Sequence, residues 1–434
     1  MRGFDPSHPD FFNQADLEAE IDRIYDICHG CRLCFNLCPS FPFLFDRIDE
    51  QGDAELGGVS WADKMRTVDL CYNCKLCVPK CPYIPPHHYE LDFAQLMLRA
   101  KAVRAKHEGI KSGDKFLGNP QLVGKIGGIS APLTNALNAP GSLPRKVMEK
   151  TLGLEASRKL PPIAAEPFER WWAKRGPSVP RGERRGAVAL FYTCSLNHNW
   201  PDAAKALVEV LEHNGFEVRC PEQRCCGMPA LDGGDIDLAT EWAHQNLDSL
   251  HAAVAEGCEI IIPGPSCSMM IKDEYPTLTR DERAKEVAAH TWDAAQFLLH
   301  VHKSLGGLDT EFVWHPETVA YHQPCHLKVQ NMGVPARKLI ALTGAKVKLV
   351  DQCSGMDGTW GMKHEFYELS MKQATKLAKG LEKVGAELIA SDCSLASLQV
   401  DEVLQHRPLH PVEVLHRAYG LGAPPTSASE GDTP

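Results

Sequence analysis

The chain has 434 residues, 24% of them charged, and a net charge of −10 at neutral pH. This balance argues against a nucleic-acid-binding protein, which would need a basic surface. The 17 cysteines occur at metal-ligand spacings, which indicates a reducing cytoplasm rather than a secreted disulfide scaffold. Residues 1–16 lack the pattern of a secretory signal, and no apolar run approaches the roughly 18 residues that cross a bilayer. We therefore expect a cytoplasmic protein whose membrane attachment, if any, is peripheral on the inner face or made through a partner.

Two cysteine motifs in the first hundred residues share one spacing. Each has three cysteines at every third position, then a fourth, then a proline: Cys28, Cys31, Cys34, Cys38 and Pro39, and Cys71, Cys74, Cys77, Cys81 and Pro82. This is the bacterial ferredoxin spacing for two cubane [4Fe–4S] clusters, in which the fourth cysteine of each motif binds the other cluster. The predicted ligand sets are therefore Cys28, Cys31, Cys34 and Cys81 for one cluster, and Cys71, Cys74, Cys77 and Cys38 for the other. Zinc sites, the main alternative besides unligated thiols, usually have separated pairs of ligands.

Helical patterns flank the two motifs, at residues 17–25 and 89–105. We predict a helical two-cluster ferredoxin-like domain over residues 1–112. Residues 113–185 are rich in glycine, proline and small residues, which indicates a linker region with some ordered turns. Its apolar stretch at 116–143 either packs on the first domain or lies on a membrane or a partner protein.

Strands and helices alternate from residue 186 onward, which predicts parallel sheets flanked by helices. The same order occurs twice, over 186–310 and 311–420, with predicted strands at 187–192, 216–218 and 259–262, and at 318–321, 346–350 and 387–390. Cysteines follow the strand ends at similar spacings in both halves, where open α/β sheets build their sites. The predicted fold is α+β and multidomain: the helical ferredoxin-like domain, two duplicated α/β repeats, and a disordered tail at 421–434.

Two cubane motifs followed by two cysteine-rich CCG repeats resemble the heterodisulfide reductase electron-transfer family. That family includes the C subunit of anaerobic glycerol-3-phosphate dehydrogenase and the iron–sulfur subunits of glycolate and lactate oxidation systems, and the resemblance spans about residues 20–420. It implies that the CCG cysteines can hold a further cluster, here with candidate ligands Cys194, Cys225, Cys226 and Cys267 in the first repeat, and Cys325, Cys353 and Cys393 in the second. The match is partial, because non-cysteine residues stand at expected ligand positions: Gly264, Ser354 and Ala390. The seven cysteines are either ligands, with His322 or His326 completing the second set, or buried packing residues.

The sequence contains no glycine-rich nucleotide fingerprint, so we expect single-electron transfer without hydride chemistry. The protein is then an electron-transfer subunit, the oxidoreductase component that receives electrons from a separate dehydrogenase, expected to be a flavoprotein. The electrons pass through the two clusters to the CCG domain and on to a quinone, a cytochrome or a thiol/disulfide acceptor. The alternative is a heterodisulfide-reductase-like enzyme that itself reduces a disulfide or similar oxidant at a CCG-bound cluster. A third interpretation is a binding protein whose CCG half carries no metal. No catalytic residue is assigned.

Overall fold

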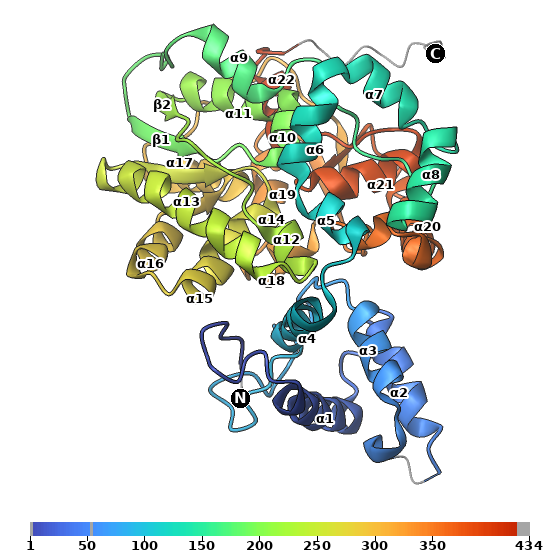
Figure 1. Ribbon diagram of the computed structural model, residues 1–434. Coiled ribbons are helices and arrows are strands. Elements are labelled where there is room, and N and C mark those ends of the chain that lie inside the picture. The colour runs from blue at the N-terminus through green and yellow to red at the C-terminus, as the bar shows by residue number, and fades with distance from the viewer. Residues whose placement is uncertain (1–2, 53–54, 423–434) are drawn as a thin grey trace.

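The computed structural model describes residues 3–52 and 55–422. A helical N-terminal part leads into a larger body that holds two parallel β-sheets (Figure 1). The segment from residue 423 onward, which falls in the tail where we expect disorder, lies outside the described residues. Within the described part of the chain, no helix combines the length and apolar character that a membrane span requires.

The N-terminal part is built from helices: α1 (Gln14–Cys31), α2 (Ser40–Asp49), the short 3-10 helix η1 (Leu56–Gly58), α3 (Trp61–Asp69) and α4 (Phe93–Glu108). The Asn13 side chain caps α1 by accepting from a backbone N–H, and Arg32, with φ of 55°, ends it. Apolar faces of α1, α2 and α4 form one core, which includes Ile24, Phe41 and Met97. This packing brings the last turn of α1 and the turns after α1 and α3, which together carry the two cysteine motifs, to a shared pocket.

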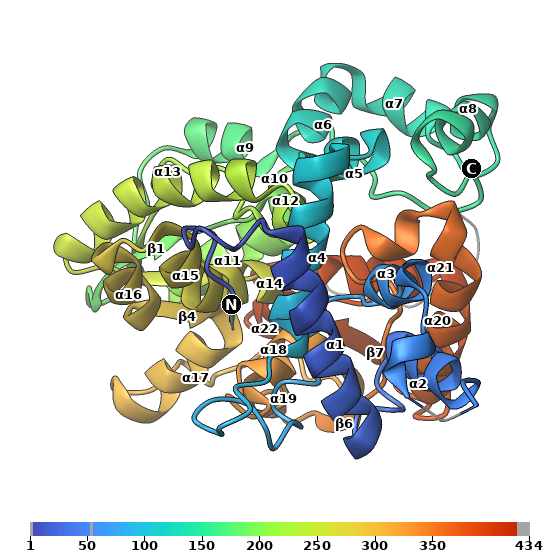
Figure 2. The ribbon, with the colours of Figure 1, turned by 60° about the horizontal axis from the view of Figure 1, so that its bottom comes forward.

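Residues 112–175 contain a second group of helices: α5 (Ser112–Gly118), α6 (Pro120–Gly127), η2 (Gly128–Ser130), α7 (Ala131–Leu137), α8 (Leu143–Leu152) and α9 (Phe168–Arg175). Proline in the first turn of α6, α7 and α8 favours these short helices, because its missing N–H has no partner there in any helix. Figures 1 and 2 place α7 and α8 near α21, whereas α5 and α6 pack against α12 and α10 of the first repeat.

Four parallel strands form the first sheet, in the order β2-β1-β3-β4. They are β1 (Gly186–Leu190), β2 (Phe216–Arg219), β3 (Glu259–Ile262) and β4 (Thr291–Asp293). The helices of this half are α10 (Cys194–His198), α11 (Pro201–His213), α12 (Met228–Asp232), α13 (Ile236–Ala255), α14 (Pro265–Met269), the π-helical turn η3 (Met270–Glu274), α15 (Tyr275–Thr279), α16 (Glu282–Ala289) and α17 (Ala294–Ser304).

Three parallel strands form the second sheet, in the order β6-β5-β7. They are β5 (Thr318–His322), β6 (Lys346–Val350) and β7 (Leu388–Ser391). The helices are α18 (Cys325–Val329), α19 (Pro335–Ala341), the 3-10 turns η4 (Trp360–Met362) and η5 (His364–Phe366), α20 (Tyr367–Glu382), α21 (Ser394–Leu404) and α22 (Pro411–Ala418). In both sheets the first strand of the half is central, with the second and third strands on either side. The predicted pair of α/β repeats with parallel sheets is confirmed.

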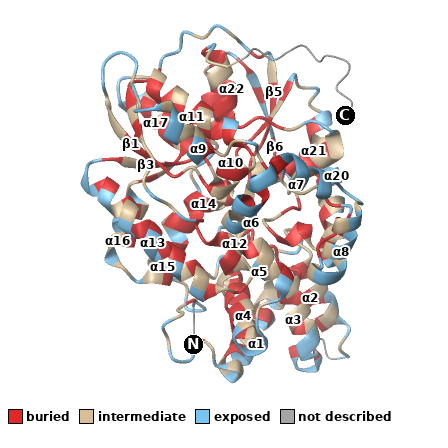
Figure 3. Cartoon of the chain, turned by 45° about the horizontal axis from the view of Figure 1, so that its top comes forward, coloured by how far each residue is buried: buried red, intermediate tan, exposed pale blue. Residues whose placement is uncertain are grey.

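The two repeats share one apolar core. Leu190 and Ile261 from the first sheet belong to the same buried cluster as Val319 and Tyr321 from the second. Helix α11 of the first repeat also packs against α22 of the second. Figure 3 shows buried residues along the strands and the helices that face them. The carboxyl ends of both central strands are thereby fixed relative to each other.

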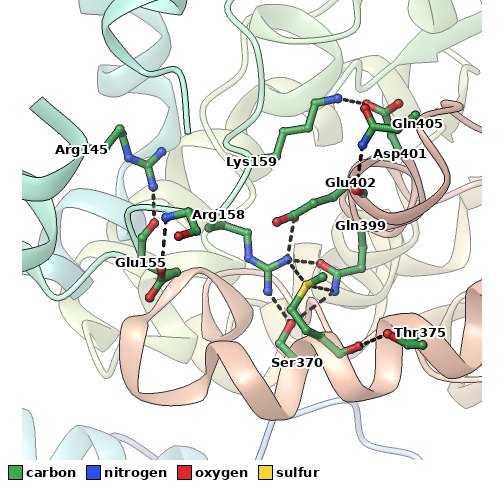
Figure 4. Close-up of polar contacts among 12 residues, drawn as sticks. Arg145, Glu155, Arg158, Lys159, Ser370, Thr375, Gln399, Asp401, Glu402 and Gln405 are labelled. Atoms are coloured by element: carbon green, nitrogen blue, oxygen red, sulfur yellow. Dashed lines mark hydrogen bonds and ion pairs between the residues drawn. The ribbon is translucent and has the colours of Figure 1, made fainter. Parts of the chain in front are cut away.

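A buried arginine joins the helices after α4 to the second repeat. The Arg158 guanidinium is fully buried and donates to Glu402 and Ser370, both at 2.7 Å, and to Gln399 (Figure 4). These partners lie on α20 and α21. Residues 112–175 are thus attached to the body through a buried polar network.

We expect Arg158→Met to lower the free energy of unfolding by about 3–5 kcal/mol, because it leaves the Glu402 carboxylate buried without its partner. Anaerobic denaturant unfolding measures the loss. The neighbouring Lys159→Met is the control: Lys159 is 37% exposed in its ion pair with Asp401, and its loss should cost about 0–1 kcal/mol. Equal effects of the two substitutions would contradict a structural role for the buried network.

Candidate functional site

Four thiols from the two cysteine motifs gather at one pocket, and we call them the first cysteine group: Cys28, Cys31, Cys34 and Cys81. The pocket has about 450 Å³ of empty space, and its walls include apolar side chains such as Phe41 and Phe93. Burial raises the pKa of Cys28 well above its usual value, as do the nearby thiols of the other three members. Uncompensated thiolates would repel each other here, so the donor set favours a cationic iron centre.

The remaining four thiols form the second cysteine group: Cys38, Cys71, Cys74 and Cys77. Burial raises the pKa of Cys71 to about 11. The pKa of Cys77 is raised well above its usual value by burial and by the nearby thiols of Cys71, Cys38 and Cys34. Cys77 also borders the pocket of the first group. The two groups are therefore adjacent, and each contains thiols from both motifs.

Backbone geometry shapes the loop of the second group. Asn73 and Lys75 have φ of 55° and 58°, in the left-handed region, so the chain turns sharply between the cysteines. The Asn73 N–H donates to the Cys71 sulfur at 3.4 Å, and the Tyr83 N–H donates to the Cys81 sulfur at the same distance. Hydrogen bonds of this kind favour thiolate sulfur and tune the reduction potential of a bound cluster.

The first repeat collects its four candidate cysteines beside the carboxyl ends of β1 and β3: Cys194, Cys225, Cys226 and Cys267. The sulfurs of Cys194 and Cys225 are 3.9 Å apart. The hydrogen bond with Cys225 and burial raise the pKa of Cys194 well above its usual value. Cys226 in turn lies within hydrogen-bonding reach of Cys225 and Cys267. All four sulfurs thus form one contiguous cluster.

Buried polar side chains hold the cysteine pair of this repeat. Asn246 accepts from the Arg224 N–H at 2.7 Å and donates to the Cys225 carbonyl at 3.2 Å. The Tyr275 hydroxyl donates to the Cys226 carbonyl at 3.0 Å. Gly227 follows with φ of 94°, and a Cβ there would approach the Ala239 backbone to 3.2 Å. The glycine of the CCG motif is therefore required by both backbone conformation and space.

The second repeat places Cys325, Cys353 and Cys393 after its three strands. Burial raises the pKa of Cys325 well above its usual value, and Asp357 and the two other thiols contribute further. His322 engages both ring nitrogens, with Ser391 at 3.0 Å and the Gln352 carbonyl at 3.1 Å. Of the two histidines considered from the sequence, His326 is the one that lies at the cavity described next.

A large cavity that opens to solvent borders thiols of both repeats. Its lining includes Cys194, Cys226, Cys267 and Cys393, Asp357 and Asp392, and apolar residues of α5, α6 and α8 such as Phe116, Val123 and Met148. Tyr72 and Asn73, from the loop of the second cysteine group, reach the same cavity. The cysteine-rich ends of the two sheets, the helices after α4 and the second motif therefore meet at one place.

The loop of the second cysteine group is fixed to both repeats. Lys75 forms a buried ion pair with Glu274 of η3, with side chains 7% and 0% exposed. On the other side, the Asn73 carbonyl accepts from the His326 ring at 3.3 Å, and the Trp360 indole N–H donates to the Asp69 carbonyl at 2.8 Å. The second group cannot move away from the repeats without breaking these contacts.

The sequence prediction named none of Asn73, Lys75, Glu274 or Asp357. Lys75 and Asn73 lie between motif cysteines but have no property there that distinguishes them from solvent-exposed loop residues. Glu274 is 199 positions from its partner, with no local pattern to mark it. Asp357 had a usable signal, because it follows closely the position where Ser354 replaces an expected cysteine.

Comparisons with known proteins identify the domains that carry these cysteines. Residues 20–82 match a 4Fe-4S dicluster domain, and residues 188–272 and 319–401 each match a cysteine-rich domain named CCG. The chain is 29% identical over 299 residues to the C subunit of anaerobic glycerol-3-phosphate dehydrogenase from Escherichia coli K12, covering 68% of this chain and 74% of that protein. It is 32% identical over 243 residues to lactate utilization protein A of an Exiguobacterium species, covering 53% of this chain and 95% of that protein.

The chain belongs to this family of iron–sulfur proteins with paired CCG domains. Lactate utilization protein A of Geobacillus thermodenitrificans is a further relative, 32% identical over 249 residues, which are 51% of this chain and 99% of that protein. As a member of the family the protein is an iron–sulfur subunit of an oxidoreductase, with [4Fe–4S] clusters in its dicluster domain. The thiols of the CCG domains are available as ligands for a further cluster.

We expect Glu274→Gln to lower the free energy of unfolding by about 3–5 kcal/mol, because Lys75 then stays buried without its ion-pair partner. A Lys75→Met/Glu274→Met double variant should recover much of this loss, and anaerobic thermal unfolding measures both. Arg66→Met is the matched control. Its ion pair with Glu365 likewise joins the N-terminal part to the α/β body, but the two side chains are 36% and 46% exposed. A Glu274→Gln effect no larger than that of the control would contradict the importance of the buried pair.

Proposed function

We propose that the protein carries electrons from a partner dehydrogenase, a flavoprotein, to an acceptor bound at the large cavity. One relative is by name a subunit of a glycerol-3-phosphate dehydrogenase and another takes part in lactate utilization, which supports a separate dehydrogenase as the donor. The observation that carries the proposal is the second cysteine group. Its loop reaches the cavity lined by CCG cysteines, and Cys74 lies near Cys325 of the second repeat.

We assign one cluster to the first cysteine group and the other to the second, within a helical ferredoxin-like domain. Each cluster supplies reversible one-electron chemistry when bound. The chain leaves the first group partly exposed and buries Cys71, Cys74 and Cys77. Leu33 and Phe35, beside the first group, are 50% and 43% exposed. The donor therefore docks at the first group, and the second group faces the acceptor.

We assign a further iron–sulfur cluster to the four thiols of the first repeat. They are contiguous, and Cys225, Cys226 and Cys267 are buried. At Gly264, where the family pattern has another cysteine, a Cβ would approach Thr193 to 3.0 Å and the Cys267 sulfur to 3.8 Å. A side chain at position 264 would therefore be crowded by Thr193, and we assign the cluster to the four thiols that are present.

The acceptor we propose is a lipid-soluble quinone. Helices α6, α7 and α8 contribute lining residues to the cavity, and the same segment exposes large apolar side chains to solvent: Leu122, Ile126, Ile129, Leu133, Leu137, Leu143 and Val147. Three exposed lysines, Lys125, Lys146 and Lys150, lie among them, in a chain of net charge −10. An apolar surface with local positive charge is suited to an anionic membrane. The protein would bind the inner membrane face there, with the cavity directly behind this surface.

Single cysteine variants test the cluster assignments. We expect Cys81→Ala, Cys74→Ala and Cys226→Ala each to remove about four irons and four sulfides per chain, from the first group, the second group and the first repeat respectively. Iron and acid-labile sulfide analysis with EPR on anaerobic protein measures this, and Cys220→Ala, outside all three groups, is the control. Full iron content in Cys226→Ala would contradict the assignment of a cluster to the first repeat.

Direct disulfide reduction is the second candidate function, because contiguous thiols lie at the cavity. The same variants separate it from the proposed relay. We expect dithionite-reduced protein to be reoxidised by a short-chain quinone faster than by an aliphatic disulfide. A preference for the disulfide that is lost in Cys226→Ala would instead support a heterodisulfide-reductase-like enzyme.

Vesicle binding tests the membrane surface. We expect the protein to sediment with vesicles of anionic phospholipid, and an Ile129→Glu/Leu143→Glu variant to bind at least about tenfold more weakly, because it places two charges in the apolar surface. Ile129 and Leu143 are 86% and 77% exposed, and Val179→Glu, at a 69% exposed position elsewhere, is the matched control. Equal binding of all three proteins would contradict the assignment.

A further inference from the structure

We propose that the second repeat holds a single divalent transition-metal ion of the Zn²⁺ type, bound by Cys325, His326 and Asp357. One ligand atom from each of these residues lies within 4.8 Å of the other two. A zinc ion binds sulfur at about 2.3 Å and nitrogen or oxygen at about 2.0–2.2 Å. Ligand atoms this close together can therefore share one ion after small side-chain adjustments.

Comparison of the two repeats within the chain shows what the second has exchanged. Cys325 corresponds to Cys194, since each is the first cysteine after the central strand of its sheet. With the Gly-Met pairs aligned, Ser354 takes the place of Cys226, and Asp357 stands where the first repeat has Pro229. His326 likewise stands where the first repeat has Ser195. The second repeat has thus lost a thiol and gained an imidazole and a carboxylate beside the remaining cysteine.

The carboxylate of Asp357 lacks a partner that would explain its position. Its Oδ2 atom is buried and makes no hydrogen bond within the described residues. The nearby cation Lys101 is already paired with Asp232 at 2.7 Å. A buried carboxylate oxygen without a donor is costly, and a metal ion would satisfy it.

The imidazole of His326 is oriented as metal-binding histidines are. The Asn73 carbonyl can only accept, so it takes the proton of Nε2 at 3.3 Å. Nδ1 is then the nitrogen available to the metal; it lies 2.8 Å from the Ser266 hydroxyl, a hydrogen bond that the metal would replace. A ring fixed through a backbone carbonyl is the usual outer contact of a metal-ligating histidine. Both His326 and Asp357 line the large cavity.

Sulfur, nitrogen and oxygen donors together suit a borderline ion such as Zn²⁺. Three protein ligands leave one position of a tetrahedral site for a ligand from the cavity. Cys353 and Cys393 lie near Cys325, but neither belongs to the group of three whose ligand atoms all lie within 4.8 Å of one another. The proposal is independent of the electron acceptor and of the cluster in the first repeat.

Metal analysis of the full chain, purified anaerobically and dialysed against a chelator, tests the proposal. We expect about one zinc per chain, and zinc K-edge X-ray absorption should show one sulfur with nitrogen and oxygen ligands. The isosteric variants Asp357→Asn and His326→Gln should bind zinc at least about tenfold more weakly, with iron and sulfide unchanged. Asp392→Asn is the control, because Asp392 also lines the cavity but lies outside the three-ligand group, and one of its carboxylate oxygens accepts from the Tyr321 hydroxyl at 2.6 Å.

Three results would overturn the single-ion site. One is wild-type protein that retains no zinc, which the absorption measurement reports even if a variant fails to fold. Another is zinc retained equally in both ligand variants and the control. The third is a joint loss of iron and sulfide in Asp357→Asn or His326→Gln, which would place these residues on an iron–sulfur cluster. Reoxidation of the reduced clusters by quinone, measured on the same samples, shows separately whether the relay operates.

Discussion

The buried ion pair between Lys75 and Glu274 is the contact on which the arrangement depends. It fixes the loop of the second cysteine group against the first repeat, while Asn73 and Trp360 connect the same region to the second repeat. Burying two charges is costly unless they are paired, so the pair enforces one docking position for the loop. Electron transfer between metal centres needs such a fixed geometry, which two domains joined by a flexible linker would not provide.

Duplication of the α/β repeat places this loop beside a cavity that cysteines of both repeats line. Both sheets have their first strand at the centre, and their shared core turns the carboxyl ends of β1 and β5 toward one cavity. The first repeat keeps four contiguous thiols there, whereas the second keeps fewer and adds His326 and Asp357. The two halves thus have the same fold and different donor chemistry.

Patterns local in sequence predicted much of this protein. The alternation of strands and helices predicted both repeats, and the cysteine spacing predicted the dicluster domain. The short strand β4, only three residues long, was missed because it has too few residues to show a strand pattern. The attachment of the helices after α4 rests on Arg158, whose partners are more than 200 positions away. Lys75 and Glu274 are also distant, and such pairings depend on the tertiary fold rather than on local pattern.

The central claim is that the second cysteine group lies between the donor side and the acceptor cavity. Rapid-freeze EPR of fully reduced protein mixed with a short-chain quinone tests it most directly, with Cys81→Ala used to identify the signal of the first group. The account predicts that the second-group cluster is oxidised first and the first-group cluster later, at a rate limited by transfer within the chain. Oxidation of the first-group cluster before the second, or at a rate unaffected by loss of the second-group cluster in Cys74→Ala, would contradict it.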